Sequence, residues 1–177
     1  MNRPAEEFYR YFTMAELLVH ALVIELEAVH SYLELATQME ECGNDPVAKL
    51  FAKMAEFEQE HADKIREQAG DIKLPELAPW EYRWPGFEPP ENIDSAGIHY
   101  LMTPHQALKL ALENEMSALA FFEGIASSNT DERVHSLAEE FAEDERQHVA
   151  WMEEWLAKYP APDADWDYDP DPPVAID

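Results

Sequence analysis

Four of the seven histidines in this chain have a glutamate three residues before them. The four pairs are Glu27/His30, Glu58/His61, Glu132/His135 and Glu145/His148. Residues three apart share one face of a helix, so the carboxylate and imidazole of such a pair can point at the same metal ion. A chain this rich in glutamate also produces the spacing by chance. The motif alone therefore cannot say which pairs bind metal, and their positions in the helices must decide.

End signals predict four long helices. Thr13 and Glu16 form a capping box, and Pro46 and Pro104 stand in the first turns of the second and third helices. The predicted helices run from Thr13 to about Glu41, from Asp45 to Gly70, from Thr103 to about 127–130, and from Thr130 to about Lys158. A short extra helix is predicted over residues 3–12.

The chain also repeats itself in two halves. Aligning the halves puts like residues at like positions: Glu25 on Glu115, Tyr32 on Phe122, Glu58 on Glu145 and His61 on His148. The sequence therefore predicts two related helical hairpins.

Helical periodicity separates the four pairs. Core-facing positions recur every three or four residues, and polar residues interrupt each apolar stripe only near its middle. The interrupting residues are Glu25, Glu58, His61, Glu115, Glu145 and His148. The other two pairs share faces with further polar residues: Glu27/His30 with His20, Glu34 and Glu41, and Glu132/His135 with Glu139, Glu143 and Arg146. We predict that the interrupting set points inward and that the other two faces are solvated.

Four inward glutamates without an inward lysine or arginine must either be protonated or bind cations. An ionised carboxylate taken from water without a partner costs several kcal/mol. Two divalent ions would balance four carboxylates, and neutral imidazoles ligate without adding charge. Oxygen and imidazole ligands suit iron or manganese. The predicted metal ligands are therefore Glu25, Glu58, His61, Glu115, Glu145 and His148, and the alternative is a metal-free network of hydrogen-bonded Glu and His.

Composition narrows the class of protein. The 177 residues carry a formal net charge of −26, which argues against nucleic acid and anionic membranes as partners because their phosphates would be repelled. The 46% hydrophobic content is enough for one domain with a core. The single cysteine, Cys42, cannot form an internal disulfide, and the sequence shows no signal peptide or membrane span. A cytoplasmic location is expected.

Two segments lie outside the predicted helices. The bundle is expected over residues 1–159, with a crossover at about 71–103 that is rich in proline and aromatic residues and has no helical period. We interpret the crossover as a wrap packed along the bundle by Trp80, Trp84 and Phe87, with a substrate lid as the alternative. The acidic tail at 160–177 is predicted to be solvated and disordered. Partner docking or iron gathering are its alternatives.

The six-residue pattern resembles the di-iron carboxylate proteins of the ferritin-like superfamily, in which two helices give one Glu each and the other two give a Glu-x-x-His each. Over about residues 14–158 the chain is similar to the rubrerythrin and bacterioferritin branch. The stretch ELEAVHSY at 25–32 carries the likeness, because in this family an aromatic residue, often Tyr, commonly stands seven residues after a ligand Glu. The resemblance implies an all-α, ferritin-like four-helix bundle of two hairpins joined by one long crossover.

The resemblance also implies two ions, iron or else manganese, with particular ligand roles. Glu58 and Glu145 would bridge the ions, Glu25 and Glu115 would be terminal ligands, and Tyr32 would place one hydroxyl near the site.

One outer residue makes the halves unequal. By the resemblance, Asp144 would orient His61 through the free ring nitrogen of the imidazole. The matching position in the first hairpin is Phe57. The two ions are therefore expected to be inequivalent.

The implied function is a non-haem di-iron oxidoreductase that reacts with O₂ or hydrogen peroxide, as a ferroxidase or in an oxidative-stress role, with an external electron donor where iron is not the reductant. Ala118 stands where rubrerythrins carry a further Glu, and the cysteines of a rubredoxin domain are absent. No fifth helix is visible, so a homodimer is expected rather than a 24-subunit shell. The alternatives are oxidation of an organic substrate, a di-manganese catalase-like activity, or a non-catalytic metal-binding bundle that docks a partner.

Overall fold

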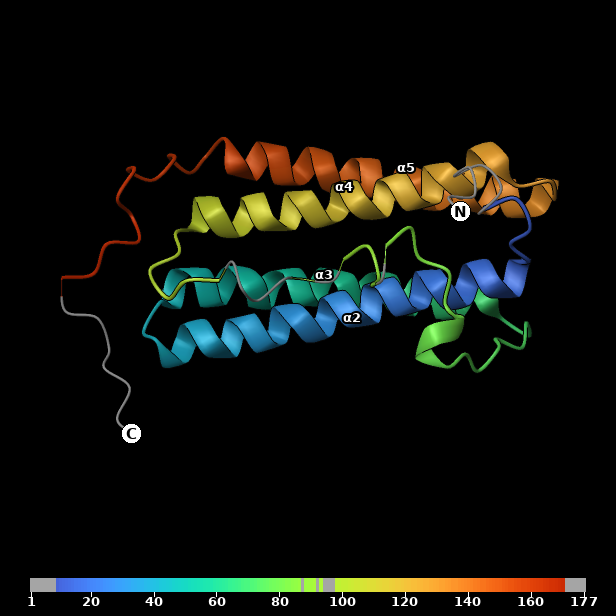
Figure 1. Cartoon of the computed structure of the whole chain (residues 1–177), viewed down its shortest axis with the longest axis horizontal. Coiled ribbons are helices and arrows are strands. Elements are labelled where there is room, and N and C mark those ends of the chain that lie inside the picture. Colours follow the sequence, from blue (N-terminus) through green and yellow to red (C-terminus); the bar gives the residue numbers. More distant parts are fainter. Residues whose placement is uncertain (1–8, 87, 92, 94–97, 171–177) are drawn as a thin grey trace.

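The structure of the protein, a computed structural model, describes residues 9–86, 88–91, 93 and 98–170. Four long helices lie side by side (Figure 1). They are α2 (Met14–Glu41), α3 (Asp45–Ala69), α4 (Pro104–Ser128) and α5 (Glu132–Leu156), with a short 3-10 helix η1 (Pro79–Glu81) between α3 and α4. The part of the chain that the structure describes contains no strand. The predicted all-α four-helix bundle is confirmed.

Local signals fix the helix ends close to their predicted places. At the start of α2, the Glu16 N–H donates to the Thr13 hydroxyl at 3.2 Å, and the Thr13 N–H donates to the Glu16 carboxylate at 2.8 Å. Asp131, rather than Thr130, caps α5, which ends at Leu156. Shifts of one or two residues are usual at helix ends and leave the register of the helix interiors unchanged.

The helices form two antiparallel hairpins. Helix α2 packs mainly against α3, and α4 mainly against α5, while contacts between the hairpins are sparser. Helices α3 and α4 run in the same direction, so the crossover between them returns along the length of the bundle (Figure 1). This is the predicted topology of two hairpins and one long crossover.

Two asparagines anchor the hairpins in the same way. Asn44, in the α2–α3 turn, donates to the backbone carbonyls of residues 100 and 102, just before α4, at 3.1 and 2.7 Å. Asn129, in the α4–α5 turn, donates to the carbonyls of residues 9 and 12, just before α2, at 3.1 and 3.0 Å. The repeat therefore extends beyond the helices, because each turn holds the segment that leads into the other hairpin.

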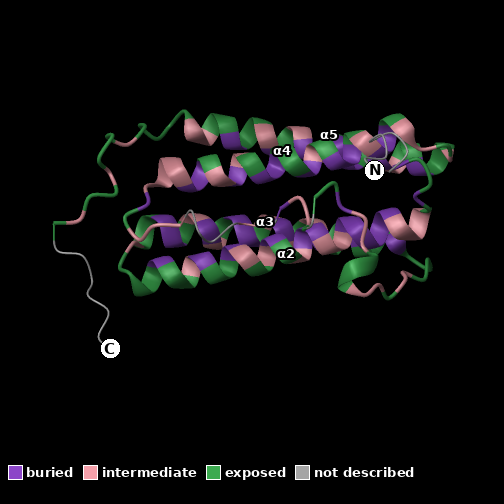
Figure 2. Cartoon of the chain, in the orientation of Figure 1, coloured by how far each residue is buried: buried purple, intermediate pink, exposed green. Residues whose placement is uncertain are grey.

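The apolar core is divided into two clusters. Buried residues line the inner faces of all four helices (Figure 2). One cluster, which includes Leu18 and Phe121, lies toward the start of α2, and the other, which includes Phe51 and Leu108, lies toward its end. The stretch between them falls near the middle of every helix, where the sequence places its inward polar residues.

Two sequence predictions were wrong where the crossover meets the bundle: the packing of Trp80 and the exposure of His20. Trp84 is buried, as a wrap requires, but Trp80 is 84% exposed and does not pack on the bundle; Phe87 lies outside the described residues. The prediction of a solvated α2 face was wrong at His20, which is 1% exposed. The crossover covers it there: His20 Nε2 accepts the Arg83 N–H at 2.9 Å, and Nδ1–H donates to the Glu16 carbonyl at 2.7 Å.

The acidic tail is described as far as residue 170. Trp166 packs against the second apolar cluster and meets the His99 ring edge-on, and the Tyr100 hydroxyl donates to the Asp169 carboxylate. These contacts attach the first part of the tail to the end of the crossover. Most of the predicted extra helix, residues 3–8, and residues 171–177 lie outside the described residues.

Among the described residues, no helix combines the length and the apolar composition that crossing a membrane requires.

Candidate metal centre

The six predicted ligands lie in one layer at mid-bundle. Five are buried and His61 is half-buried. The residues come from all four helices: Glu25 from α2, Glu58 and His61 from α3, Glu115 from α4, Glu145 and His148 from α5. The other two pairs, Glu27/His30 and Glu132/His135, are exposed. Helical periodicity therefore sorted the four Glu-x-x-His pairs correctly by burial.

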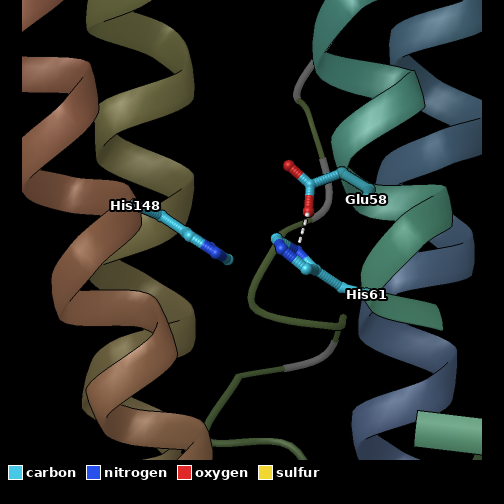
Figure 3. Close-up of side chains that lie close together, drawn as sticks. All are labelled: Glu58, His61 and His148. Atoms are coloured by element: carbon cyan, nitrogen blue, oxygen red, sulfur yellow. Dashed lines mark hydrogen bonds and ion pairs between the residues drawn. The ribbon is translucent and has the colours of Figure 1, made fainter. Parts of the chain in front are cut away.

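On the first-hairpin side, His61 and Glu58 point into the space between the hairpins, toward His148 on α5 (Figure 3). The two imidazole rings stack with their centroids 4.1 Å apart and an interplanar angle of 10°. His61 Nδ1 lies 3.3 Å from Glu58 Oε2 and 3.8 Å from Glu25 Oε2. This imidazole thus presents Nδ1 to carboxylates from two helices.

The second-hairpin side has the same arrangement with shorter distances. His148 Nδ1 lies 3.1 Å from Glu115 Oε2 and 3.1 Å from Glu145 Oε2. His148 also stacks against Trp151, which is 48% exposed. The repeat seen in the sequence is therefore also a repeat in the geometry of the site.

Three overlapping sets of ligand atoms lie close enough to share an ion. Within each set the atoms are all within 4.8 Å of one another: Glu58/His61/His148, Glu115/Glu145/His148 and Glu25/Glu58/Glu91. Bonds of about 2.0–2.2 Å from one ion to oxygen or nitrogen separate opposite ligands by roughly 4.0–4.4 Å. Each set therefore has about the size of one coordination sphere. Together these sets define the polar layer: Glu25, Glu58, His61, Glu91, Glu115, Glu145 and His148.

Sequence reasoning missed Glu91 and its neighbour Asn114. Glu91 belongs to the crossover, yet it is 2% exposed. Asn114, also buried, lies on α4 and points its Nδ2 at the Glu91 carbonyl, 3.5 Å away. Periodicity cannot reveal an inward residue in a segment that has no helical period. Asn114 adjoins Glu115 on the inward face, which was the one signal available for it.

Three carboxylates of the polar layer hold protons more tightly than exposed glutamates. Burial raises the pKa of Glu25, Glu91 and Glu115 well above its ordinary value, and the neighbouring carboxylates raise it further. Burial opposes the charged form of His148, but hydrogen bonds with Glu115 and Glu145 outweigh it and raise the pKa to about 10. Without a cation, this layer can exist only as a partly protonated cluster.

Tyr32 and Asp144 occupy different positions relative to this layer. Tyr32 is 1% exposed, interacts through its hydroxyl with the Asn114 amide, and has a pKa raised well above 10 by burial and by nearby carboxylates. Asp144 is partly exposed, and its Oδ2 lies 3.4 Å from Lys64 Nζ. Its predicted hydrogen bond to His61 remains a prediction.

A small cavity of about 20 Å³ lies beside the histidines. Its lining residues include Glu25, Glu145 and the two histidines, together with Lys64, Gln68 and Asp144. A volume of roughly 10–15 Å³ on this measure holds one water molecule. The cavity thus accommodates a ligand of one or two heavy atoms.

Comparison with known proteins gives the family. The family model described as rubrerythrin matches residues 16–156. The chain belongs to the rubrerythrin family. A solved structure of an uncharacterized conserved protein from Magnetospirillum magnetotacticum MS-1 is similar to this rubrerythrin-family chain, with 38% identity, a TM-score of 0.66, and coverage of 86% of this chain and 99% of that one. No curated protein matches this chain.

The residues of this rubrerythrin-family site fit a pair of divalent metal ions. Two buried carboxylate atoms, Glu25 Oε2 and Glu91 Oε1, have no hydrogen-bond partner. Buried polar atoms are nearly always paired, so these two indicate that the site accepts a further group. The donors are carboxylate and imidazole, and Cys42 is exposed and free. Such donors suit iron or manganese rather than a thiolate-bound metal.

Proposed function

We propose that this protein is a non-haem di-iron oxidoreductase that reacts with O₂ or hydrogen peroxide, as a ferroxidase or in an oxidative-stress role. The observation that carries the proposal is the charge of the polar layer. Among the described residues, the buried acidic and basic side chains are five glutamates and His148 of this layer, plus His20; His61 is half-buried, and no lysine or arginine is buried. Divalent cations are the partners that such a layer requires.

The residues divide the work of holding such ions. Glu115, Glu145 and His148 would hold one ion, and Glu58 with His61 would hold the other, since those groups already converge. Glu58 and Glu145 lie at equivalent positions of the two hairpins and are the proposed bridging ligands. When bound, two ferrous ions supply two electrons for the reduction of O₂ or peroxide.

Tyr32 is the proposed hydrogen-bond donor beside the layer. Its raised pKa keeps the phenol neutral, so the hydroxyl can donate a hydrogen bond to a group bound in the layer. Its position among Glu58, Glu91 and Glu115, which all affect its pKa, supports this role.

The size of the cavity favours a small oxidant over an organic substrate. About 20 Å³ beside His61 and His148 accommodates O₂ or peroxide, whereas sites for organic ligands typically enclose several hundred Å³. This argument makes oxidation of an organic substrate the weaker alternative. A cytoplasmic location, a homodimer and an external electron donor remain predictions.

Metal content and oxygen consumption test the proposal. The full chain, purified without added metal, should contain about two iron ions per chain by elemental analysis, or take up two Fe(II) ions anaerobically. Exposure of the Fe(II)-loaded protein to O₂ or peroxide should then consume the oxidant faster than free Fe(II) does. A chain that takes up no metal, or that takes it up without consuming either oxidant, contradicts the proposal.

Two alanine variants make the test specific. Glu115→Ala should lower occupancy from two ions to one or none, because it removes a carboxylate from a converging set. Glu132→Ala, the same change on the exposed face of α5, should retain both ions and the wild-type oxidation rate. Equal losses in both variants would mean that the buried layer is not where the metal binds.

A further inference from the structure

Glu91 is the one member of the polar layer that does not come from a helix. It lies in the crossover, whereas the other six residues lie on α2, α3, α4 and α5. The residue is 2% exposed, and its Oε1 atom has no hydrogen-bond partner. A structural carboxyl group this deeply buried would be expected to share both oxygens with donors. Its free oxygen indicates that Glu91 faces a ligand.

Glu91 also belongs to a converging set of carboxylates. One oxygen each of Glu25, Glu58 and Glu91 lies within 4.8 Å of the others. The Glu25 atom Oε2 is likewise unpartnered. His61 Nδ1 lies 3.8 Å from that Glu25 atom and 3.3 Å from Glu58 Oε2. Three carboxylates therefore converge from α2, α3 and the crossover, and the His61 imidazole lies beside two of them, Glu25 and Glu58.

We propose that Glu91 is a seventh metal ligand, which binds the ion held by Glu25, Glu58 and His61. The bound ion is divalent iron or manganese, and the assignment of Glu91 rests on the proposed function. The ion on the other side, held by Glu115, Glu145 and His148, does not bind Glu91. The two ions therefore differ in charge environment: the first has the additional carboxylate, and the second does not.

The position of Glu91 gives this ligand a structural consequence. Because Glu91 belongs to the crossover, an ion bound by Glu25, Glu58 and Glu91 links that segment to α2 and α3. Without metal, the Glu91 carbonyl accepts a long hydrogen bond of 3.5 Å from Asn114 Nδ2 on α4. The ion would therefore attach the Glu91 side chain directly to two helices of the bundle.

The test compares metal binding by the wild-type full chain, Glu91→Gln and Glu76→Gln. Glutamine has nearly the same shape as glutamate but lacks the charge. Glu76 is an exposed glutamate of the same crossover, so it is the matched control. Each chain is titrated anaerobically with Mn(II) and with Fe(II), and the number of bound ions and their separate affinities are measured. Circular dichroism verifies that each variant is folded.

We expect wild type and Glu76→Gln to bind two ions. Glu91→Gln should bind one ion with unchanged affinity and the other at least tenfold more weakly. Hydrogen exchange gives a second readout: Mn(II) should slow exchange of the amides of Glu88 and Glu91, which flank two prolines, in wild type and not in Glu91→Gln. If Glu91→Gln does not fold, the metal-dependent protection of these amides in wild type decides the question.

Three results would overturn the assignment. Two ions bound by Glu91→Gln with wild-type affinities would show that Glu91 is not a ligand, while leaving the proposed function intact. Equal weakening of both ions would contradict its assignment to one of them. A wild-type chain that binds no metal would overturn both the assignment and the proposed function.

Discussion

Glu25, Glu91 and Glu115 face one another in a space from which most water is excluded, so their protonation depends on what else occupies it. Burial and mutual repulsion raise their pKa values in the folded chain. In the unfolded chain the pKa of glutamate returns to about 4.3. Between these limits the folded protein binds more protons than the unfolded one. Stability without metal must then fall as pH rises.

We predict that the free energy of unfolding of the metal-free protein decreases between about pH 6.5 and pH 8.5. The raised pKa of His148, about 10, acts in the same direction, because its contribution is complete only below the unfolded value and is lost as pH rises toward the folded one. Urea unfolding in the presence of a chelator measures this. The slope should flatten in Glu115→Gln and with saturating Mn(II). Stability that increases with pH in this range would contradict the raised pKa values.

The Glu-x-x-His pairs also show why the sequence could separate buried pairs from exposed ones. Glu27/His30 and Glu132/His135 have the same spacing as the buried pairs, but they lie on exposed faces. Spacing alone determines which residues share a face. The apolar residues above and below a pair determine whether that face is buried.

At the scale of elements, His20 connects α2 to the crossover. It is packed among aromatic rings, with Phe12, Tyr82 and Trp84 at centroid distances of 4.8–5.1 Å. Nδ1–H donates to a carbonyl of α2, and Nε2 accepts from the crossover. A neutral imidazole satisfies both contacts, whereas a protonated one cannot accept the Arg83 N–H. The anchor therefore depends on His20 remaining neutral.

We predict that His20→Phe lowers the free energy of unfolding at pH 7 by about 1–3 kcal/mol, because it leaves the partly buried Arg83 N–H unpaired. Burial lowers the pKa of His20 to about 4, so its contribution is complete above about pH 6.5 and is lost as pH falls toward 4.

The difference in stability between wild type and His20→Phe should accordingly shrink at pH 5. Chemical denaturation of both chains at pH 7 and pH 5 measures that difference directly. Because the carboxylates of the polar layer are present in both chains, their titration cancels. A difference that stays constant or grows at pH 5 would mean that His20 is not held neutral.

For the molecule as a whole, the polar layer is the weak section of the core. It separates two apolar clusters and contributes charge where a bundle of this length would otherwise pack continuously. The net charge of −26 adds repulsion throughout the chain. Metal ions are therefore expected to stabilise the fold as well as to supply chemistry.

We predict that chelation lowers the melting temperature. One ion at a free concentration of 100 times its Kd stabilises by about 2.7 kcal/mol, which corresponds to roughly 5–10 °C for a chain of this size. Calorimetry with excess Mn(II) and with a chelator measures this shift. Glu115→Ala should show a smaller shift than wild type, and Glu132→Ala the full one. A melting temperature that does not respond to metal in wild type would contradict metal binding by the folded state.

The sequence by itself determined the four helices and the six inward residues on them. A helix repeats every 3.6 residues, so the type of each residue predicts its face once the helix ends are known. Thr13 and Pro104 marked two of those ends, and Glu25 and Glu115 then followed as polar residues on apolar stripes. The burial of all these positions depends on local geometry and on the presence of a partner helix.

Only the tertiary structure decided which side chains the crossover brings to the bundle. Glu91 and the Arg83 N–H lie in a segment without a period, and whether such a residue is buried depends on how the chain returns across α2, α3 and α4. For the same reason His20 was predicted to be exposed: its own helix cannot indicate that another segment covers it. The core site follows from local rules, but its seventh residue follows from contacts between segments far apart in the sequence.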